Sequence, residues 1–258
     1  MPNYLTYPFK TMRITQRYDG ETSHKPHMTG TPKEYALDEG GKDTGRDWCY
    51  CPCDEMKVVK LTGVGAKGTN ALYLTSSTKC CLADGRESIV TLQLVHPNDD
   101  DLKKLKVGQK FKRGEKICRE GNDGASGYHI HMAVGRGSII GTGWEKNSKG
   151  KWVLVTTGGP IKPEDAFYID PNFTKVVNSA GLKFKTLPQE KPKAGTYKVI
   201  CDALNVRNGT TKEAKIVDVI TRGTQVKISK TKIGERDGGY WGKIDGMGWV
   251  SMQYLKKV

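Results

Sequence analysis

The histidines are the residues of this chain with the clearest chemical potential. All five of them, His24, His27, His96, His129 and His131, lie within its first 131 residues. His129 and His131 flank Ile130 in the stretch YHIHMAV, and on a β-strand the period of two would place both imidazoles on one face. Because an imidazole can either ligate a metal or carry a proton near neutral pH, such a pair can divide these two tasks.

Zinc is the metal that suits these residue types. Imidazole nitrogen and carboxylate oxygen are typical zinc ligands, and a catalytic site uses three of them. The segment 24–41, HKPHMTGTPKEYALDEGG, offers His24 or His27 and then Asp38 or Glu39. The residues alone leave both choices open, and a surface or hydrogen-bonded core position is an equally common interpretation of a lone His-x-His pair.

The order of the motifs along the chain helps to select among these candidate zinc ligands. Leu94-Val95-His96 is followed by Val-Gly-Gln at 107–109, by Arg-Gly at 113–114, and by a Gly/Ser-rich loop at 121–127 that leads into His-x-His. Upstream, Cys-Pro-Cys-Asp at 51–54 precedes an apolar stretch. This order resembles the lysostaphin-like zinc peptidases, which cut peptidoglycan cross-links and carry an Ala-Pro-x-Asp-Gly turn where residues 51–54 stand. The resemblance spans roughly residues 24 to 134.

Carried over position by position, the resemblance implies a role for each matched residue. His131 corresponds to a zinc ligand, and Asp38 lies at about the right distance before the Cys-Pro turn to be the carboxylate ligand. His129 and His96 correspond to the two catalytic imidazoles. The expected cofactor is therefore Zn²⁺.

The first histidine ligand departs from the family pattern. The family places it four residues before the aspartate, where this chain has Glu34. We take His27 as the ligand, with His24 as the alternative, and an insertion of about TGTPKEYA would have to loop out between the ligands. Because the first histidine ligand is displaced from the family position, an altered or inactive site is an alternative interpretation.

The chemistry of amide hydrolysis fits such a residue set. Zinc polarises a carbonyl and lowers the pKa of a bound water to about 7. A base must then take the proton of the water, and a donor must stabilise the developing oxyanion. The chain has no His-Glu-x-x-His motif to supply a glutamate base, so the two imidazoles that are not needed as ligands, His96 and His129, are the candidates.

Strands must position these side chains. The residues 46–60, 89–95 and 128–134 have strand-like patterns, and the 31 glycines and 11 prolines favour strands joined by turns. We expect a mainly β protein, with an antiparallel-sheet peptidase domain over residues 1–182. The Lys-, Pro- and Glu-rich residues 183–195 are the expected linker.

The remaining residues, 196–258, contain short strands with evenly spaced turns, which predict a small barrel. The strings Leu-Asn-Val-Arg at 204–207, Arg-Gly-Thr-Gln-Val at 222–226, Trp-Gly-Lys-Ile at 241–244 and Gly-Trp-Val at 248–250 resemble a bacterial SH3-like domain, the kind that anchors wall-active enzymes. A structural interpretation of the aromatic residues is that Trp241, Trp249 and Tyr254 fill the barrel core.

Charge and composition limit the possible partners. With 42 basic and 28 acidic residues the net charge is +14, which attracts polyanions such as nucleic acid, anionic lipid or cell-wall polymer. No apolar run reaches the length of a membrane span, and the start lacks the apolar core of a secretory signal. Seven cysteines at irregular spacing suggest synthesis in a reducing cytosol, and for Cys49, Cys51 and Cys53 core packing is favoured over a second metal site.

These features predict a peptidoglycan endopeptidase held on a Gram-positive wall by its C-terminal domain, of the phage or prophage endolysin type. Such a protein is made in the host cytoplasm and acts on the wall after release, with anionic wall polymers as additional partners and no nucleic acid or membrane insertion. The alternatives are a catalytically inactive wall-binding or regulatory protein and, on charge alone, a nucleic-acid binder.

Overall fold

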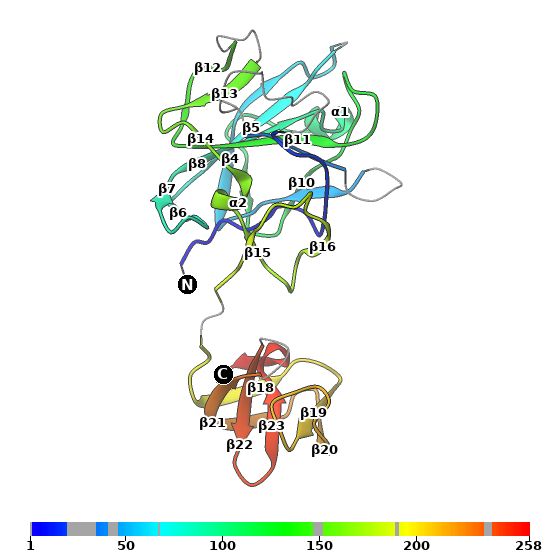
Figure 1. The fold of residues 1–258 in the computed structure, drawn as a ribbon, viewed down its shortest axis with the longest axis vertical. Coiled ribbons are helices and arrows are strands. Elements are labelled where there is room, and N and C mark those ends of the chain that lie inside the picture. Colours follow the sequence, from blue (N-terminus) through cyan, green and yellow to red (C-terminus); the bar gives the residue numbers. More distant parts are fainter. Residues whose placement is uncertain are drawn as a thin grey trace. The chain divides into compact units, whose positions relative to one another are not determined.

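The computed structural model describes residues 2–19, 35–40, 46–66, 68–146, 152–188, 191–234 and 239–258. Contacts between residues divide the chain into two compact units, Met1–Leu187 and Pro188–Val258. Both units consist mainly of strands, which confirms the prediction of a mainly β protein (Figure 1). No helix among the described residues has the length and apolar character needed to cross a membrane.

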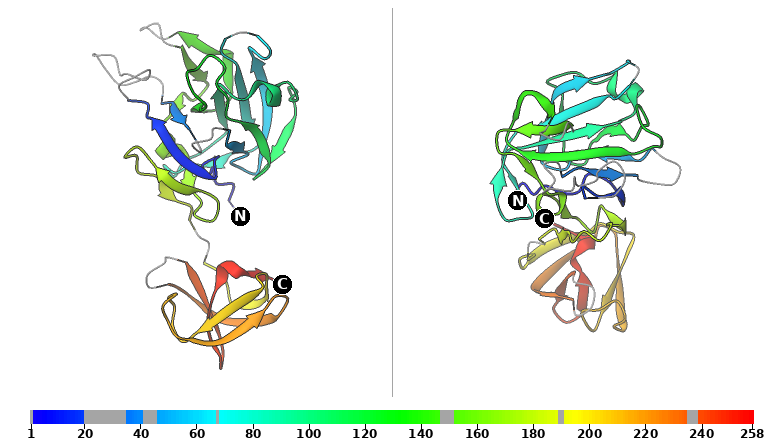
Figure 2. Two further views of the ribbon diagram at one scale, coloured as in Figure 1. Left: turned by 90° about the vertical axis from the view of Figure 1, so that its right-hand side faces the viewer. Right: turned by 45° about the horizontal axis from the view of Figure 1, so that its top comes forward.

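A nine-stranded sheet forms the framework of the first unit, and its strands lie side by side in Figure 2. The order of its strands is β16 (Lys175–Asn178), β1 (Thr11–Gln16), β2 (Leu37–Glu39), β11 (Ile130–Arg136), β8 (Val90–Val95), β5 (Ala71–Ser76), β4 (Glu55–Thr62) and β9 (Lys110–Lys112), with β14 (Pro160–Ile161) also paired to β11. The pairing is antiparallel except between β1 and β16. Segments distant in sequence thereby become neighbours.

Alternation along the central strands gives this sheet two different faces. On β11, Ile130, Met132 and Val134 are buried in the large apolar core, while Ala133 belongs to a smaller cluster on the other face. The smaller cluster includes Leu154 and is packed by Trp144, both from the hairpin of β12 (Ile139–Lys146) and β13 (Trp152–Thr156). The hairpin therefore covers part of the face opposite the main core.

Short elements complete the first unit. Strand pairs join β3 to β10, β6 to β7 and, in parallel, β15 to β17. Two single-turn helices, α1 and α2, follow β8 and β14. The bounds are β3 (Trp48–Tyr50), β10 (Lys116–Arg119), β6 (Cys80–Cys81), β7 (Glu87–Ser88), β15 (Tyr168–Ile169), β17 (Lys185–Thr186), α1 (Asp99–Leu102) and α2 (Pro163–Ala166).

Two strand predictions differ from the structure at the residues that matter for chemistry. The stretch 46–60 is not one strand, because the chain leaves β3 after Tyr50 and begins β4 at Glu55. Strand β11 begins at Ile130, so His129 precedes it and lies in an isolated bridge with Gly121. The cysteines between and beside β3 and β4, Cys49, Cys51 and Cys53, are buried and free, in agreement with core packing.

The second unit has its own sheet and core. Its seven strands follow the order β20-β19-β23-β22-β21-β18-β24, and a 3-10 helix, η1, precedes the last strand. The bounds are β18 (Gly195–Val199), β19 (Ala203–Arg207), β20 (Ile216–Thr221), β21 (Gln225–Ile233), β22 (Tyr240–Ile244), β23 (Gly248–Ser251), η1 (Met252–Tyr254) and β24 (Leu255–Lys257).

This sheet differs from the expected barrel in one respect. Among the described residues the ladder runs from β20 to β24 without a pairing between these two ends, so hydrogen bonds do not close it. Val206, Ile228 and Val250 are in its apolar core. Trp241 is buried as predicted, whereas Tyr254 is 42% exposed and does not fill the core.

Candidate active site

Strand β2 separates two adjacent carboxylates onto opposite faces of the large sheet. Glu39 is fully buried, where it accepts hydrogen bonds from the hydroxyl of Tyr7 and from the backbone N–H of Arg13. Burial, with the negative charge of Glu39 as a further cause, raises the pKa of Tyr7 well above its usual value. Asp38 faces the other way, toward the histidines. The geometry therefore favours Asp38 over Glu39 as the carboxylate of the site.

Asp38 and His131 meet because β2 and β11 pair with these two residues in register. Oδ1 of Asp38 lies 3.1 Å from Nδ1 of His131. The second carboxylate oxygen, Oδ2, accepts a hydrogen bond of 2.8 Å from Nε2 of Gln16, which pairs with Asp38 from β1 on the other side. Three neighbouring strands thus fix the orientation of the carboxylate.

His129 approaches the same carboxylate from the loop before β11. Its Nε2 lies 3.8 Å from Oδ1 of Asp38, and its Nδ1 lies 3.0 Å from the carbonyl oxygen of Gly127. The backbone N–H of His129 donates to the carbonyl of Gly121. Since a carbonyl only accepts, Nδ1 of His129 carries the proton in that contact and Nε2 is the ring nitrogen that faces the site.

His96 completes the cluster from the end of β8. Its backbone has a φ of 66°, in the left-handed region, and its Nδ1 lies 2.6 Å from the carbonyl oxygen of Asp123. The ring centre of His96 is 4.9 Å from that of His129 and 6.5 Å from that of His131. Burial lowers the pKa of His96 below its usual value, which favours the neutral imidazole.

Glu120, which the sequence did not single out, and Gly121, the first residue of the Gly/Ser-rich loop, support the two imidazoles. Glu120 bridges to Pro97, next to His96, while Gly121 bridges to His129. A Cβ at Gly121 would lie 2.6 Å from the backbone oxygen of His96, so only glycine fits this crossing. Glu120 is fully buried and accepts the backbone N–H groups of residues 46 and 47, and burial raises its pKa to about 7.

The pair formed by Asp38 and His131 suits a zinc ion in donor chemistry. Two atoms that share a tetrahedral zinc with bonds near 2.05 Å lie about 3.3 Å apart, close to the observed 3.1 Å between Oδ1 and Nδ1. A hydrogen bond would account for the same separation. Within the described ranges, no three His, Cys, Asp or Glu side chains are arranged to hold a metal. The expected first ligand, His27, and its alternative His24 lie outside these ranges.

Four of the predicted site residues are therefore brought together from three separate segments: Asp38, His96, His129 and His131. The side chains of Asp38, His131 and His129 are 12%, 14% and 20% exposed, so the cluster is largely shielded from solvent. Gln16 was missed in the sequence, because only the pairing of β1 with β2 brings it to Asp38. The ligand and catalytic roles remain predictions.

Comparison with known proteins bears on both units. Residues 202–256 match the family model of the bacterial SH3 domain, which confirms the SH3-like prediction for the C-terminal unit. No protein of curated function matches the chain.

Similar solved structures include lysostaphin in solution, with 13% identity, a TM-score of 0.39 and coverage of 97% of this chain and 91% of that chain. The antimicrobial peptidase lysostaphin from Staphylococcus simulans has 14% identity, a TM-score of 0.37 and coverage of 95% and 92%. A proposed M23 peptidase from Pseudomonas aeruginosa has 16% identity, a TM-score of 0.31 and coverage of 52% and 46%. These neighbours belong to the group that the sequence motifs resemble, and at such identities the roles of residues rest on the geometry of the chain itself.

Proposed function

We propose that the protein is a zinc-dependent endopeptidase that cuts peptide cross-links of bacterial peptidoglycan. The observation that carries this proposal is the convergence of one carboxylate and three imidazoles, Asp38, His96, His129 and His131, on one face of the large sheet. The resemblance of the motifs to lysostaphin-like peptidases and the bacterial SH3 domain at residues 202–256 support the choice of peptidoglycan as substrate.

The proposed zinc ligands are Asp38, His131 and His27, with His24 as the alternative to His27. Gln16 holds one oxygen of Asp38 and leaves the other facing Nδ1 of His131, as expected of a residue that orients a ligand. What zinc would supply when bound is polarisation of the scissile carbonyl and a water molecule that loses its proton near neutral pH.

The two remaining imidazoles are suited to the proton transfers. His96 and His129 each direct Nδ1 to a backbone carbonyl, so in the neutral ring Nε2 is the atom free to accept a proton. Burial keeps His96 neutral over a wider pH range, which suits a base. Once protonated, Nε2 of either ring can donate to the oxyanion or to the leaving amine. His131 differs, because its Nδ1 faces a carboxylate.

The C-terminal unit is proposed to hold the enzyme on a Gram-positive wall. From Gly195 onward the chain has 12 basic and 6 acidic residues, a net charge of +6, which favours anionic wall polymers as additional partners. Even weak binding of this unit would raise the effective concentration of cross-links near the site. A catalytic unit followed by a wall-binding module fits a phage or prophage endolysin.

The direct test measures zinc content and wall hydrolysis on the same purified protein. We expect close to one zinc per chain by elemental mass spectrometry and release of peptide fragments from defined peptidoglycans. His131→Ala should lose both properties, and a comparison of His27→Ala with His24→Ala identifies the first ligand. Stoichiometric wall binding without zinc or turnover would instead favour a catalytically inactive wall-binding protein.

A further inference from the structure

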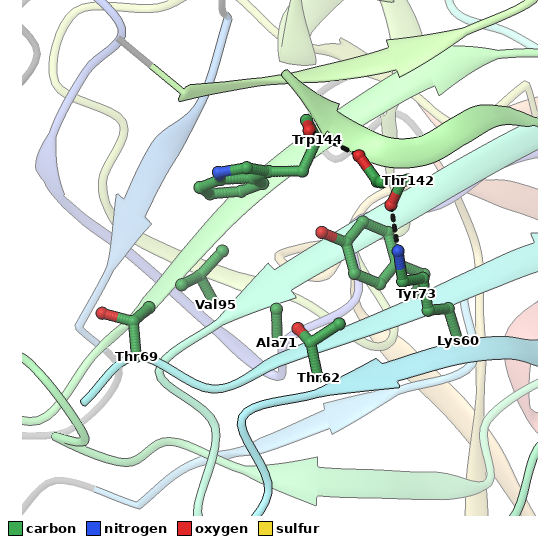
Figure 3. A pocket seen from close by; sticks show the side chains of 8 residues that line it. All are labelled: Lys60, Thr62, Thr69, Ala71, Tyr73, Val95, Thr142 and Trp144. Carbon is green, nitrogen blue, oxygen red and sulfur yellow. Dashed lines mark hydrogen bonds between the residues drawn. The ribbon is translucent and has the colours of Figure 1, made fainter. Parts of the chain in front are cut away.

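A groove of about 420 Å³ lies on the same sheet face as the candidate active site. Strand register connects the two directly, because His131 pairs with Val95, Val95 with Ala71, and Ala71 with Thr62. The last three residues line the groove, as Figure 3 shows. The groove therefore lies beside the histidine cluster, on the neighbouring strands β8, β5 and β4.

Its walls combine aromatic rings with a lysine. Tyr73 and Trp144 contribute the rings, and Lys60 contributes the charge (Figure 3). The ammonium group of Lys60 donates a hydrogen bond to the carbonyl oxygen of Thr142 and lies 5.7 Å from the ring centre of Tyr73. These contacts hold the ammonium at the groove.

A β-bulge is the reason that Lys60 faces this groove. The register between β4 and β5 shifts between Val58, which pairs with Leu74, and Lys60, which pairs with Tyr73. Val58 is in the main core, while Val59 already packs against the cluster on the groove face. Strict alternation would return Lys60 to the core side, but the bulge directs two successive residues to one face.

Lys60 is the one charged residue among the described residues that line the groove. The lining contains no Asp or Glu, and within the described part of the chain no carboxylate forms an ion pair with Lys60. An ammonium has three donors, and the carbonyl of Thr142 takes one of them. A carboxylate of a ligand could accept the others.

We propose that Lys60 is a specificity-determining residue that binds a carboxylate of the substrate peptide in this groove. The inference rests on the proposed function and deepens it, because it selects acidic wall peptides over amidated ones. Strands lie about 4.8 Å apart, so β4 is about 14 Å from β11 across the sheet. An extended peptide advances about 3.4 Å per residue, which places the carboxylate about four residues from the scissile bond.

Binding of two matched peptides to the full-length protein tests this inference. The first is a soluble stem peptide with a free α-carboxylate on its isoglutamyl residue, and the second is the same peptide with that group amidated. Calorimetry in the presence of a chelator prevents turnover. We expect the wild type to bind the acidic peptide roughly tenfold more tightly, since a charged hydrogen bond is lost with the amide.

Lys60→Met keeps the apolar stem of the side chain and should bind both peptides equally. Lys57→Met is the matched control, because Lys57 is exposed on the same strand and does not line the groove; it should keep the wild-type preference. Lys60→Glu should favour the amidated peptide. Thermal unfolding establishes that each variant is folded.

Equal affinity of the wild type for both peptides, or a preference that survives in Lys60→Met, would overturn the inference. Failure of the proposed function has a different signature. In that case the wild type would keep its preference for the acidic peptide, whereas no peptide fragments would be released from any peptidoglycan.

Discussion

The two faces of the large sheet are built by the same strands and have opposite chemistry. One face carries the large apolar core, with Leu94, Ile130 and Met132 almost fully buried. The other carries His131 and the groove with Lys60. Because side chains alternate along a strand, one set of residues can stabilise the fold while its immediate neighbours perform chemistry.

Asp38 and Glu39 are adjacent residues that show this contrast between the two faces. Asp38 contacts imidazoles at a partly accessible site, whereas Glu39 accepts hydrogen bonds from the buried hydroxyl of Tyr7 and the part-buried N–H of Arg13. If the two faces act independently, substitutions at these positions should separate activity from stability. The predictions below test that separation, from the largest effect to the smallest.

Asp38→Asn should abolish the chemistry with little effect on the fold. The substitution replaces the one carboxylate among the three proposed zinc ligands by a neutral amide of the same size. Hydrolysis should therefore fall by at least about a thousandfold, and zinc should be lost. The midpoint of urea unfolding, measured for the metal-free proteins, should change little. An active, zinc-loaded Asp38→Asn protein would remove Asp38 from the ligand set.

Glu39→Ala should have the opposite effect. It leaves the buried hydroxyl of Tyr7 and the N–H of Arg13 without this acceptor, and each unsatisfied group costs about 1–3 kcal/mol. We expect the free energy of unfolding to fall by about 4 kcal/mol in urea titrations, with near-normal activity per folded molecule. Glu39→Gln, which keeps an acceptor oxygen, should lose less. A stable but inactive Glu39→Ala protein would contradict independence of the two faces.

Glu120, which bridges to Pro97 next to His96, makes the stability of the fold depend on pH. Its folded-state pKa is raised to about 7 by burial, so the folded state holds this proton more tightly than the unfolded state does. The stabilisation is present below the unfolded pKa of about 4.5 and is lost as pH rises toward 7. The loss is on the order of 3 kcal/mol, at 1.36 kcal/mol for each pKa unit.

Urea unfolding of the wild type and of Glu120→Gln between pH 5 and 8 measures this linkage. The difference between the two proteins should grow in favour of the variant as pH rises, since glutamine keeps an acceptor for the N–H groups of residues 46 and 47 without becoming charged. Subtraction removes the contribution of other groups, among them His96. A difference that is constant with pH would show that Glu120 does not titrate in this window.

The sequence predicted the chemistry of the site better than its support. The His-x-His spacing indicated His129 and His131, although His129 precedes strand β11 and does not lie on it. The resemblance to lysostaphin-like peptidases added His96 and Asp38. Gln16 could not be found in this way, since it reaches Asp38 only through the pairing of β1 with β2. The same limit applies to Lys60, which strict alternation would assign to the core face and a bulge turns to the groove.

Gln16→Leu should have the smallest effect. It tests whether the hydrogen bond from β1 matters only for the sheet face that carries His131 and not for the core face. Leucine has a similar size but cannot donate to Oδ2 of Asp38. The loss of such an orienting hydrogen bond typically weakens metal binding by about 10- to 100-fold, and we expect a value near tenfold by competition with a chelator. The unfolding midpoint of the metal-free protein should stay close to that of the wild type.

Thr15→Val is the matched control for this substitution. Thr15 donates to the backbone carbonyl of Asp38 and not to its carboxylate, so valine should leave zinc affinity unchanged. If Thr15→Val weakened zinc binding as much as Gln16→Leu, general disturbance of β1 would explain both results. A tenfold loss confined to Gln16→Leu would show that β1 orients the carboxylate of Asp38 through this one amide group. The face that carries His131 would then depend on a contact that does not stabilise the core face.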